Sequence, residues 1–144
     1  MKSHCICHLV AVGALSAVWS LSAAVTIDPG RAEIVSPGVD TKKAAEALQA
    51  ALEKIAGGRP ELFPTPIAGS YNFEFKPLPE GSTDDFAWAV TGEGTVFRGD
   101  HRAAVRDYLV KALGVTRDED GKPVFKLRKP LSFDALKGSG KISR

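Results

Sequence analysis

The segment from Asp40 to Gly58 constrains the fold more than any other part of the chain. Six apolar residues recur there at helical spacing and share one face: Ala44, Ala47, Leu48, Ala51, Leu52 and Ile55. Asp40 is the predicted N-cap, because its carboxylate can accept from the free amides of a first turn, and Gly57-Gly58 supplies a left-handed end. An amphipathic helix of this kind needs a second layer against which its apolar face can pack.

A second amphipathic helix is predicted between Asp100 and Gly114. Its apolar stripe has spacings typical of one helix face: Val105, Tyr108, Leu109, Ala112 and Leu113. Asp100 is the predicted N-cap and Gly114 the predicted end. The chain therefore carries two helices with one apolar face each.

Strands that are half-buried would supply the missing layer. In "YNFEFK" Tyr71, Phe73 and Phe75 alternate with polar residues, which is typical of a strand with one face on a core. "FAWAV" and "TVFRG" flank "TGEG", which is typical of a hairpin. In the first of these, small Ala87 and Ala89 face away from the larger residues, and we expect a helix to pack close to that small-residue face.

The remaining segments complete the predicted order. "AEIV" before Pro37-Gly38 is a predicted strand, the proline-rich stretch 59–70 a loop, and "VFKL" a last strand. The predicted fold is α+β, a two-layer sandwich in which two amphipathic helices pack on a mostly antiparallel sheet, in the order β-α-β-β-β-α-β.

The first 24 residues have the pattern of a cleavable signal peptide. A polar start with Lys2 precedes an apolar run from Leu9 to Leu21, and small residues Ser22 and Ala24 follow. We predict cleavage after Ala24, a secreted or periplasmic location, and no membrane span after cleavage. The predicted domain covers residues 25–127, and residues 128–144 are a predicted linker or disordered tail.

Composition narrows the chemistry of the cleaved chain. Both cysteines, Cys5 and Cys7, leave with the signal, so the domain has no disulfide framework. The net charge falls from +2 to +1 with the loss of Lys2, which gives no electrostatic case for nucleic acid. After residue 24 the chain has one histidine, His101, and no cysteine, so it offers few metal ligands. We predict no catalytic, metal or cofactor-binding residues.

The stretch "FRGDHR" holds most of the candidate binding residues, which are Arg98, Asp100 and His101, with Trp88 on the preceding strand. An RGD tripeptide acts as an adhesion motif when a mobile loop displays it. Here the tripeptide is predicted to join a strand to a helix. Gly99 permits the sharp turn and Asp100 begins the helix. We therefore favour a structural crossover. A separate hypothesis is that the forked donors of Arg98 reach a carboxylate at a domain interface.

Other catalytic patterns are weak. A small hydrolase would have to use His101 without a nucleophile motif, or a pair of carboxylates among Asp84, Asp85, Glu93, Asp118 and Glu119, all in predicted turns. Tyr71, Phe73 and Trp88 could stack on sugar rings, but strand spacing favours the core. "GSGKIS" lacks the spacing of a phosphate loop.

Two long segments resemble a known domain. "IVSPGVDTKKAAEALQAALEKIAGG" and "FAWAVTGEGTVFRGDHRAAVRDYLVKALGV" are similar to the small N-terminal domain of alpha-glucuronidases and to the domain that precedes the barrel of beta-hexosaminidases. The match covers about Ile34 to Val115 and is most specific in "RG…AV-D-L…LGV". After Val115 the chain departs from the pattern, because Thr116 and Arg117 replace an arginine and an aromatic residue.

The resemblance implies a non-catalytic domain associated with glycoside hydrolysis. The catalytic carboxylates of such enzymes lie in a following barrel, and no position here matches them. The implied partners are a catalytic barrel domain or a glycan. A secreted binding, protease-inhibitor or pro-segment-like module stays open as the alternative, with "RPELFPTPIAGS" as its contact strand.

Overall fold

The structure is a computed structural model that describes residues 25–27, 32–126, 131–133 and 136–143. The predicted signal peptide, residues 1–24, lies outside the described residues. The elements are β1 Val25–Ile27, β2 Ala32–Val35, α2 Val39–Ala56, β3 Glu61–Phe63, β4 Tyr71–Lys76, β5 Phe86–Val90, β6 Gly94–Gly99, α3 His101–Lys111, β7 Thr116–Arg117, β8 Pro123–Val124, β9 Leu131–Phe133 and β10 Lys137–Gly140.

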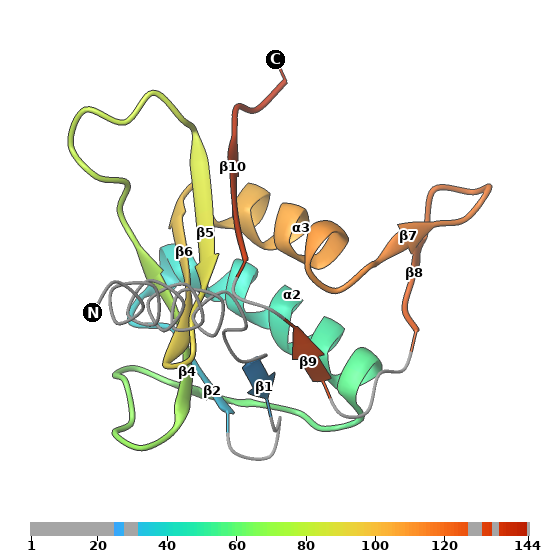
Figure 1. Cartoon of the computed structure of the whole chain (residues 1–144), viewed down its shortest axis with the longest axis horizontal. Coiled ribbons are helices and arrows are strands. Elements are labelled where there is room, and N and C mark those ends of the chain that lie inside the picture. The colour runs from blue at the N-terminus through green and yellow to red at the C-terminus, as the bar shows by residue number, and fades with distance from the viewer. Residues whose placement is uncertain (1–24, 28–31, 127–130, 134–135, 144) are drawn as a thin grey trace, which may run out of the picture.

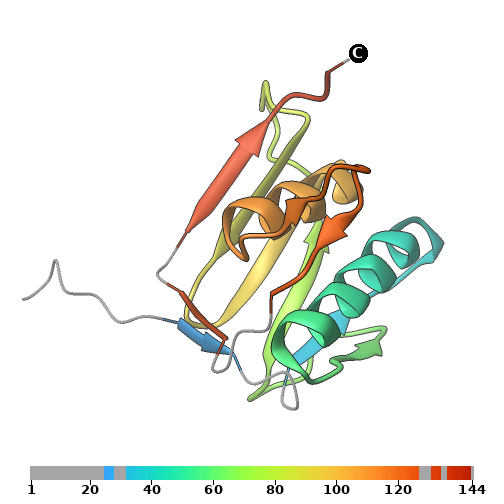
Figure 2. The same ribbon diagram turned by 90° about the vertical axis from the view of Figure 1, so that its right-hand side faces the viewer.

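A six-stranded sheet in the order β10-β5-β6-β4-β2-β3 forms one layer, and α2 and α3 form the other (Figures 1 and 2). This confirms the predicted α+β sandwich with two helices. Four of the seven described strand pairings are antiparallel, but β2–β3, β2–β4 and β4–β6 are parallel, so the main sheet is mixed.

The mixed pairing follows from where β6 lies. The chain leaves β4, passes over to β5 and returns as β6 between the two, so β6 pairs parallel with β4 and antiparallel with β5. The C-terminal end of β6 therefore lies beside the C-terminal end of β4, and α3 begins there. The end of β6 and the start of α3 hold three of the candidate binding residues.

The predicted apolar faces meet in the core. Leu48, Leu52 and Ile55 of α2 are almost completely buried, and so are Phe73 of β4 and Phe97 of β6. On the α3 side, the Tyr108 ring makes edge contacts with Trp88 and Phe97 at centroid distances of 5.4 and 5.2 Å. Edge-to-face rings of this kind add stability beyond the area they bury.

The prediction that a helix covers the small-residue face of β5 is wrong. Trp88 points toward α3, while Ala87 and Ala89 line a depression on the opposite face, together with Val96 and Arg98. The larger residues of β5 face the helices because burying an aromatic ring stabilises the fold more than burying a methyl group.

The beginning of α2 also differs from the prediction. Gly38 is the N-cap, and no side chain caps the helix there. Asp40 lies in the first turn instead, where its negative charge interacts favourably with the positive end of the helix dipole. The predicted end is confirmed, because Gly57 adopts a left-handed conformation with φ of 73°.

Part of the proline-rich stretch is a strand, although residues 59–70 were predicted as a loop. β3 pairs parallel with β2, and the backbone N–H of Ser36 donates to Phe63 O at 2.8 Å. The buried amide of Gln49 donates to Pro60 O at 2.7 Å, which holds the start of β3 against α2. Only tertiary contacts therefore make this segment extended and ordered.

The prediction of a linker or disordered tail is wrong for Lys137–Gly140, which forms β10 at the edge of the sheet. Among the described strands, β8 pairs only with β7, so the described part of "VFKL" does not supply the last strand of that sheet. Gly138 and Gly140 lie opposite Trp88 and Phe86, and a Cβ at Gly138 would come within 2.6 Å of the Trp88 ring. The two glycines leave room for the aromatic rings of β5.

Candidate functional site

The strand-to-helix junction at Gly99 and Asp100 is built from backbone contacts. Gly99 has a φ of 75°, and a Cβ there would collide with Asp85 O and with the Leu78 side chain. The Asp100 N–H donates to Asp85 O at 2.9 Å, and its carboxylate accepts from the Ala103 N–H at 3.0 Å. The predicted N-cap and the predicted turn are both confirmed.

Arg98 and His101 hold the end of β4. Arg98 Nη1 donates to Pro77 O at 3.0 Å, and His101 Nε2 lies 3.2 Å from Lys76 O. Because a carbonyl oxygen only accepts, Nε2 carries the proton in this contact. The His101 ring also packs on Phe75 with a centroid distance of 5.1 Å. These two residues bind the backbone at the C-terminal ends of β4 and β6, where α3 begins.

Trp88 lies away from this junction, on the helix-facing side of the sheet. Its indole N–H donates to Asp107 Oδ2 at 2.8 Å, and only 3% of the residue is exposed. Asp107 Oδ1 also forms an ion pair with Lys111 at 3.1 Å. The structure therefore brings Arg98, Asp100 and His101 together but separates Trp88 from them, and a ligand-binding role for all four stays a prediction.

The aromatic residues considered for sugar stacking belong mostly to the core. Phe73 is fully buried, and Tyr71 is half-buried with its ring 5.3 Å from Phe73. The Tyr71 hydroxyl lies 2.8 Å from Thr95 Oγ1. Burial raises the pKa of the Tyr71 phenol, and the hydrogen bond with Thr95 partly offsets the rise. These rings are not displayed as a platform for a sugar.

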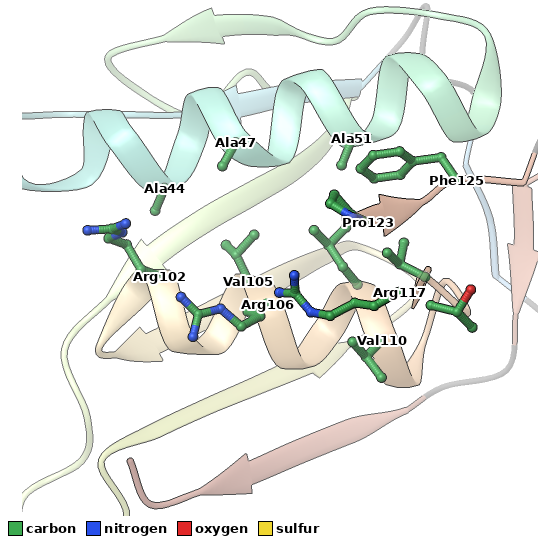
Figure 3. A pocket seen from close by; sticks show the side chains of 13 residues that line it. Ala44, Ala47, Ala51, Arg102, Val105, Arg106, Val110, Arg117, Pro123 and Phe125 are labelled. Carbon is green, nitrogen blue, oxygen red and sulfur yellow. The ribbon is translucent and has the colours of Figure 1, made fainter. Parts of the chain in front are cut away.

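Sequence reasoning missed a groove between α2, α3 and the β7–β8 hairpin. It has a volume of about 270 Å³ and an apolar floor that includes Ala44, Ala51 and Val105 (Figure 3). Three arginines line the same groove: Arg102, Arg106 and Arg117. Among the described residues that line the groove, none is an aspartate or a glutamate.

One sequence signal could have pointed to this groove. Arg102 and Arg106 are four residues apart on a predicted helix, which places them on one face, next to the apolar stripe. Arg117 comes from a predicted turn, so only the folded hairpin brings it to the same place. The arginine cluster is therefore a product of tertiary structure.

Within the described ranges, no group of three or more histidine, cysteine, aspartate or glutamate residues is placed to hold a metal ion. Over the same ranges, no helix has both the length and the apolar character needed to span a membrane.

Solved structures share this fold. The GH20 beta-N-acetylhexosaminidase of Streptomyces coelicolor matches 83% of this chain with a TM-score of 0.58 at 12% sequence identity. A mutant Streptomyces plicatus beta-hexosaminidase in complex with its product GlcNAc matches 83% with a TM-score of 0.57 at 11% identity. The structure of CpGH84D matches with a TM-score of 0.51 at 12% identity and the same 83% of this chain.

The match covers only a small part of each neighbour. This chain spans 24%, 23% and 21% of the lengths of those three proteins. A scan against protein-family models found no match, and neither did a search of curated proteins. The resemblance to the small domain of beta-hexosaminidases is thus confirmed as a fold, while the resemblance to alpha-glucuronidases stays a prediction.

Proposed function

We propose that this chain is a secreted, non-catalytic domain that accompanies a catalytic barrel in glycoside hydrolysis. The observation that carries the proposal is the coverage: 83% of this chain matches no more than 24% of a GH20 enzyme. A match to that fraction of a larger enzyme supports the role of an accessory domain. A catalytic barrel needs about 250 residues of its own.

The contacts of the candidate residues support a non-catalytic role. His101 and Arg98 bind backbone carbonyls, and Asp100 caps α3. The polar side chains of the junction stabilise the fold, as expected of a domain that positions or supports another one.

We further propose that the accompanying barrel belongs to an alpha-glucuronidase-like enzyme. The support is the segment from Ile34 to Val115, with its "RG…AV-D-L…LGV" pattern. A second part of the proposal is secretion, which is supported by the apolar run from Leu9 to Leu21 and the small residues at Ser22 and Ala24.

Sequencing the transcript through and beyond this coding region tests the proposal. We expect a barrel-length segment of about 250 residues in the same frame or in an adjacent, co-transcribed frame. The barrel is then assayed with aldouronic oligosaccharides and with p-nitrophenyl N-acetyl-β-D-glucosaminide, and preference for the second would overturn the alpha-glucuronidase assignment. A transcript with no such segment would overturn the accessory role.

An assay of the purified domain completes the test. We expect no hydrolysis of either substrate by the domain alone. Hydrolysis that persists after repurification and is lost in His101→Ala would instead identify a small hydrolase. Amino-terminal sequencing of the exported protein tests secretion, and the expected first residue is Val25.

A further inference from the structure

We propose that the groove between α2, α3 and the β7–β8 hairpin binds an acidic, apolar segment of a partner protein. Carboxylates of that segment would pair with Arg102, Arg106 and Arg117, and an apolar side chain between them would lie on the floor of the groove. The inference stands on the groove itself and does not depend on the proposed glycosidase association.

The described residues supply no ionic partner for two of the three arginines in the groove. Within the part of the chain that the structure describes, neither Arg102 nor Arg106 has a hydrogen-bond or ion-pair partner. The nearest carboxylate along α3, Asp107, is already bound by Trp88 and Lys111. An incoming carboxylate would therefore meet guanidinium groups that none of the described acidic residues neutralises.

The third arginine is held in place. Arg117 Nη1 donates to Gly121 O across the hairpin at 2.6 Å, which leaves its other N–H donors available. A planar guanidinium fork matches the two oxygens of a carboxylate, so each arginine can make a bidentate pair. In Figure 3 the side chains of Arg102, Arg106 and Arg117 follow one another along α3.

The floor is shaped by small side chains. Ala44, Ala47 and Ala51 lie along one side of α2, over a length of about 10 Å for the seven helical steps from the first to the last. Leu109 and Phe125 line the groove as well, and Lys54 Nζ lies 5.0 Å from the Phe125 ring centroid. The groove has room for one or two apolar side chains of a segment that runs along it.

The openness of the groove favours a protein segment over an enclosed small ligand. Pockets for small molecules bury most of the ligand. The apolar surface of this groove instead continues outward to Val110, which is 52% exposed. An apolar floor rimmed by arginines is typical of a protein–protein interface.

Fluorescence anisotropy with labelled peptides tests the proposal. The probes are five nine-residue peptides that combine four glutamates with two leucines at different spacings. Control probes replace every glutamate with lysine or both leucines with serine. We expect at least one acidic leucine peptide to bind, with affinity that falls as salt rises, and both replacements to weaken binding.

Variants locate the binding. We expect Arg102→Glu with Arg106→Glu to lower the affinity about tenfold or more, and Ala47→Trp to lower it by filling the groove. The matched control is Lys137→Glu on the exposed edge strand β10 with Lys141→Glu directly after it, which changes the net charge equally and should leave binding intact. Thermal unfolding of each variant establishes that it is folded.

Three results would overturn the inference. The first is that no acidic peptide binds better than its lysine counterpart. The second is that the two double variants lower the affinity equally, which would indicate unspecific charge attraction. The third is that decyl phosphate binds more tightly than any peptide and competes with all of them, which would assign the groove to a small amphiphile. None of these results bears on the catalytic partner, which the transcript decides.

Discussion

The Arg98–His101 junction and the arginine groove differ in how their polar side chains are used. In the junction, Arg98, Asp100 and His101 each bind a backbone group of the same domain. In the groove, Arg102 and Arg106 bind nothing within the described residues. The junction contains the RGD motif of the sequence, yet the groove is the surface whose guanidinium groups are available to a partner.

In this molecule a recognisable motif and an available binding site are separate properties. A polar residue near the end of a strand or helix is in reach of unpaired backbone groups, which it can satisfy. An arginine in the first or middle turns of a helix carries only donors and has no free backbone acceptor beside it, so it stays available to a partner. Substitutions in the junction should therefore affect stability, whereas those in the groove should affect binding.

The largest expected loss of stability comes from Trp88→Ala. It removes the ring that packs on Tyr108 and leaves Asp107 without its indole donor. We expect the free energy of unfolding to fall by about 3–5 kcal/mol, as measured by urea denaturation. Trp88→Phe keeps much of the ring volume and should lose less, and equal losses in the two variants would contradict a packing role.

Gly99→Ala should have the next largest effect. The position has positive φ, and the added Cβ would collide with Asp85 O. We expect a loss of about 1–3 kcal/mol in the same denaturation assay. Gly121→Ala is the matched control, because Gly121 has nearly the same φ, 76°, but nothing within 4 Å of its Cβ position. If both variants lost equal stability, the close approach at the junction would not matter.

Asp100→Ala tests the helix cap alone. The substitution leaves the Ala103 N–H without its acceptor, and the expected loss is about 1 kcal/mol. Asp100→Asn keeps an oxygen acceptor and should preserve most of the stability. A full loss in the asparagine variant would show that charge rather than the hydrogen bond holds the start of α3.

The smallest effect on stability is expected in the groove. Arg102→Glu with Arg106→Glu removes no described contact, so the free energy of unfolding should change by no more than about 0.5 kcal/mol. Arg98→Met, which removes the bond to Pro77 O, should lose more, about 1 kcal/mol. A larger loss in the groove variant than in Arg98→Met would reverse the contrast between the two regions.

Much of the fold was predictable because its signals are local. The buried faces of α2, α3, β4 and β5 follow from periodicities of 3.6 and 2, which need only neighbouring residues. The end of α2 at Gly57 and the start of α3 at Asp100 also depend on atoms a few residues away. The cap of α2 was misplaced by two residues, since Asp40 and Gly38 are both compatible with a helix start.

The errors share a different cause. β3 and β10 carry no apolar alternation, and each is extended because it adds to an existing edge of the sheet. For β10 the decisive fact lies about fifty residues away, where Trp88 and Phe86 need the space above Gly138 and Gly140. A glycine strand of this kind cannot be distinguished from a flexible tail by its own residues.

The sequence by itself determined the two amphipathic helices, the faces of the central strands, and the glycine–aspartate junction that joins β6 to α3. Each depends on side-chain spacing and on hydrogen bonds within one turn. Only the tertiary structure decided that β6 lies between β4 and β5, that β10 completes the sheet, and that Arg117 joins Arg102 and Arg106 over an alanine floor. Those outcomes depend on contacts between distant segments, which no local pattern records.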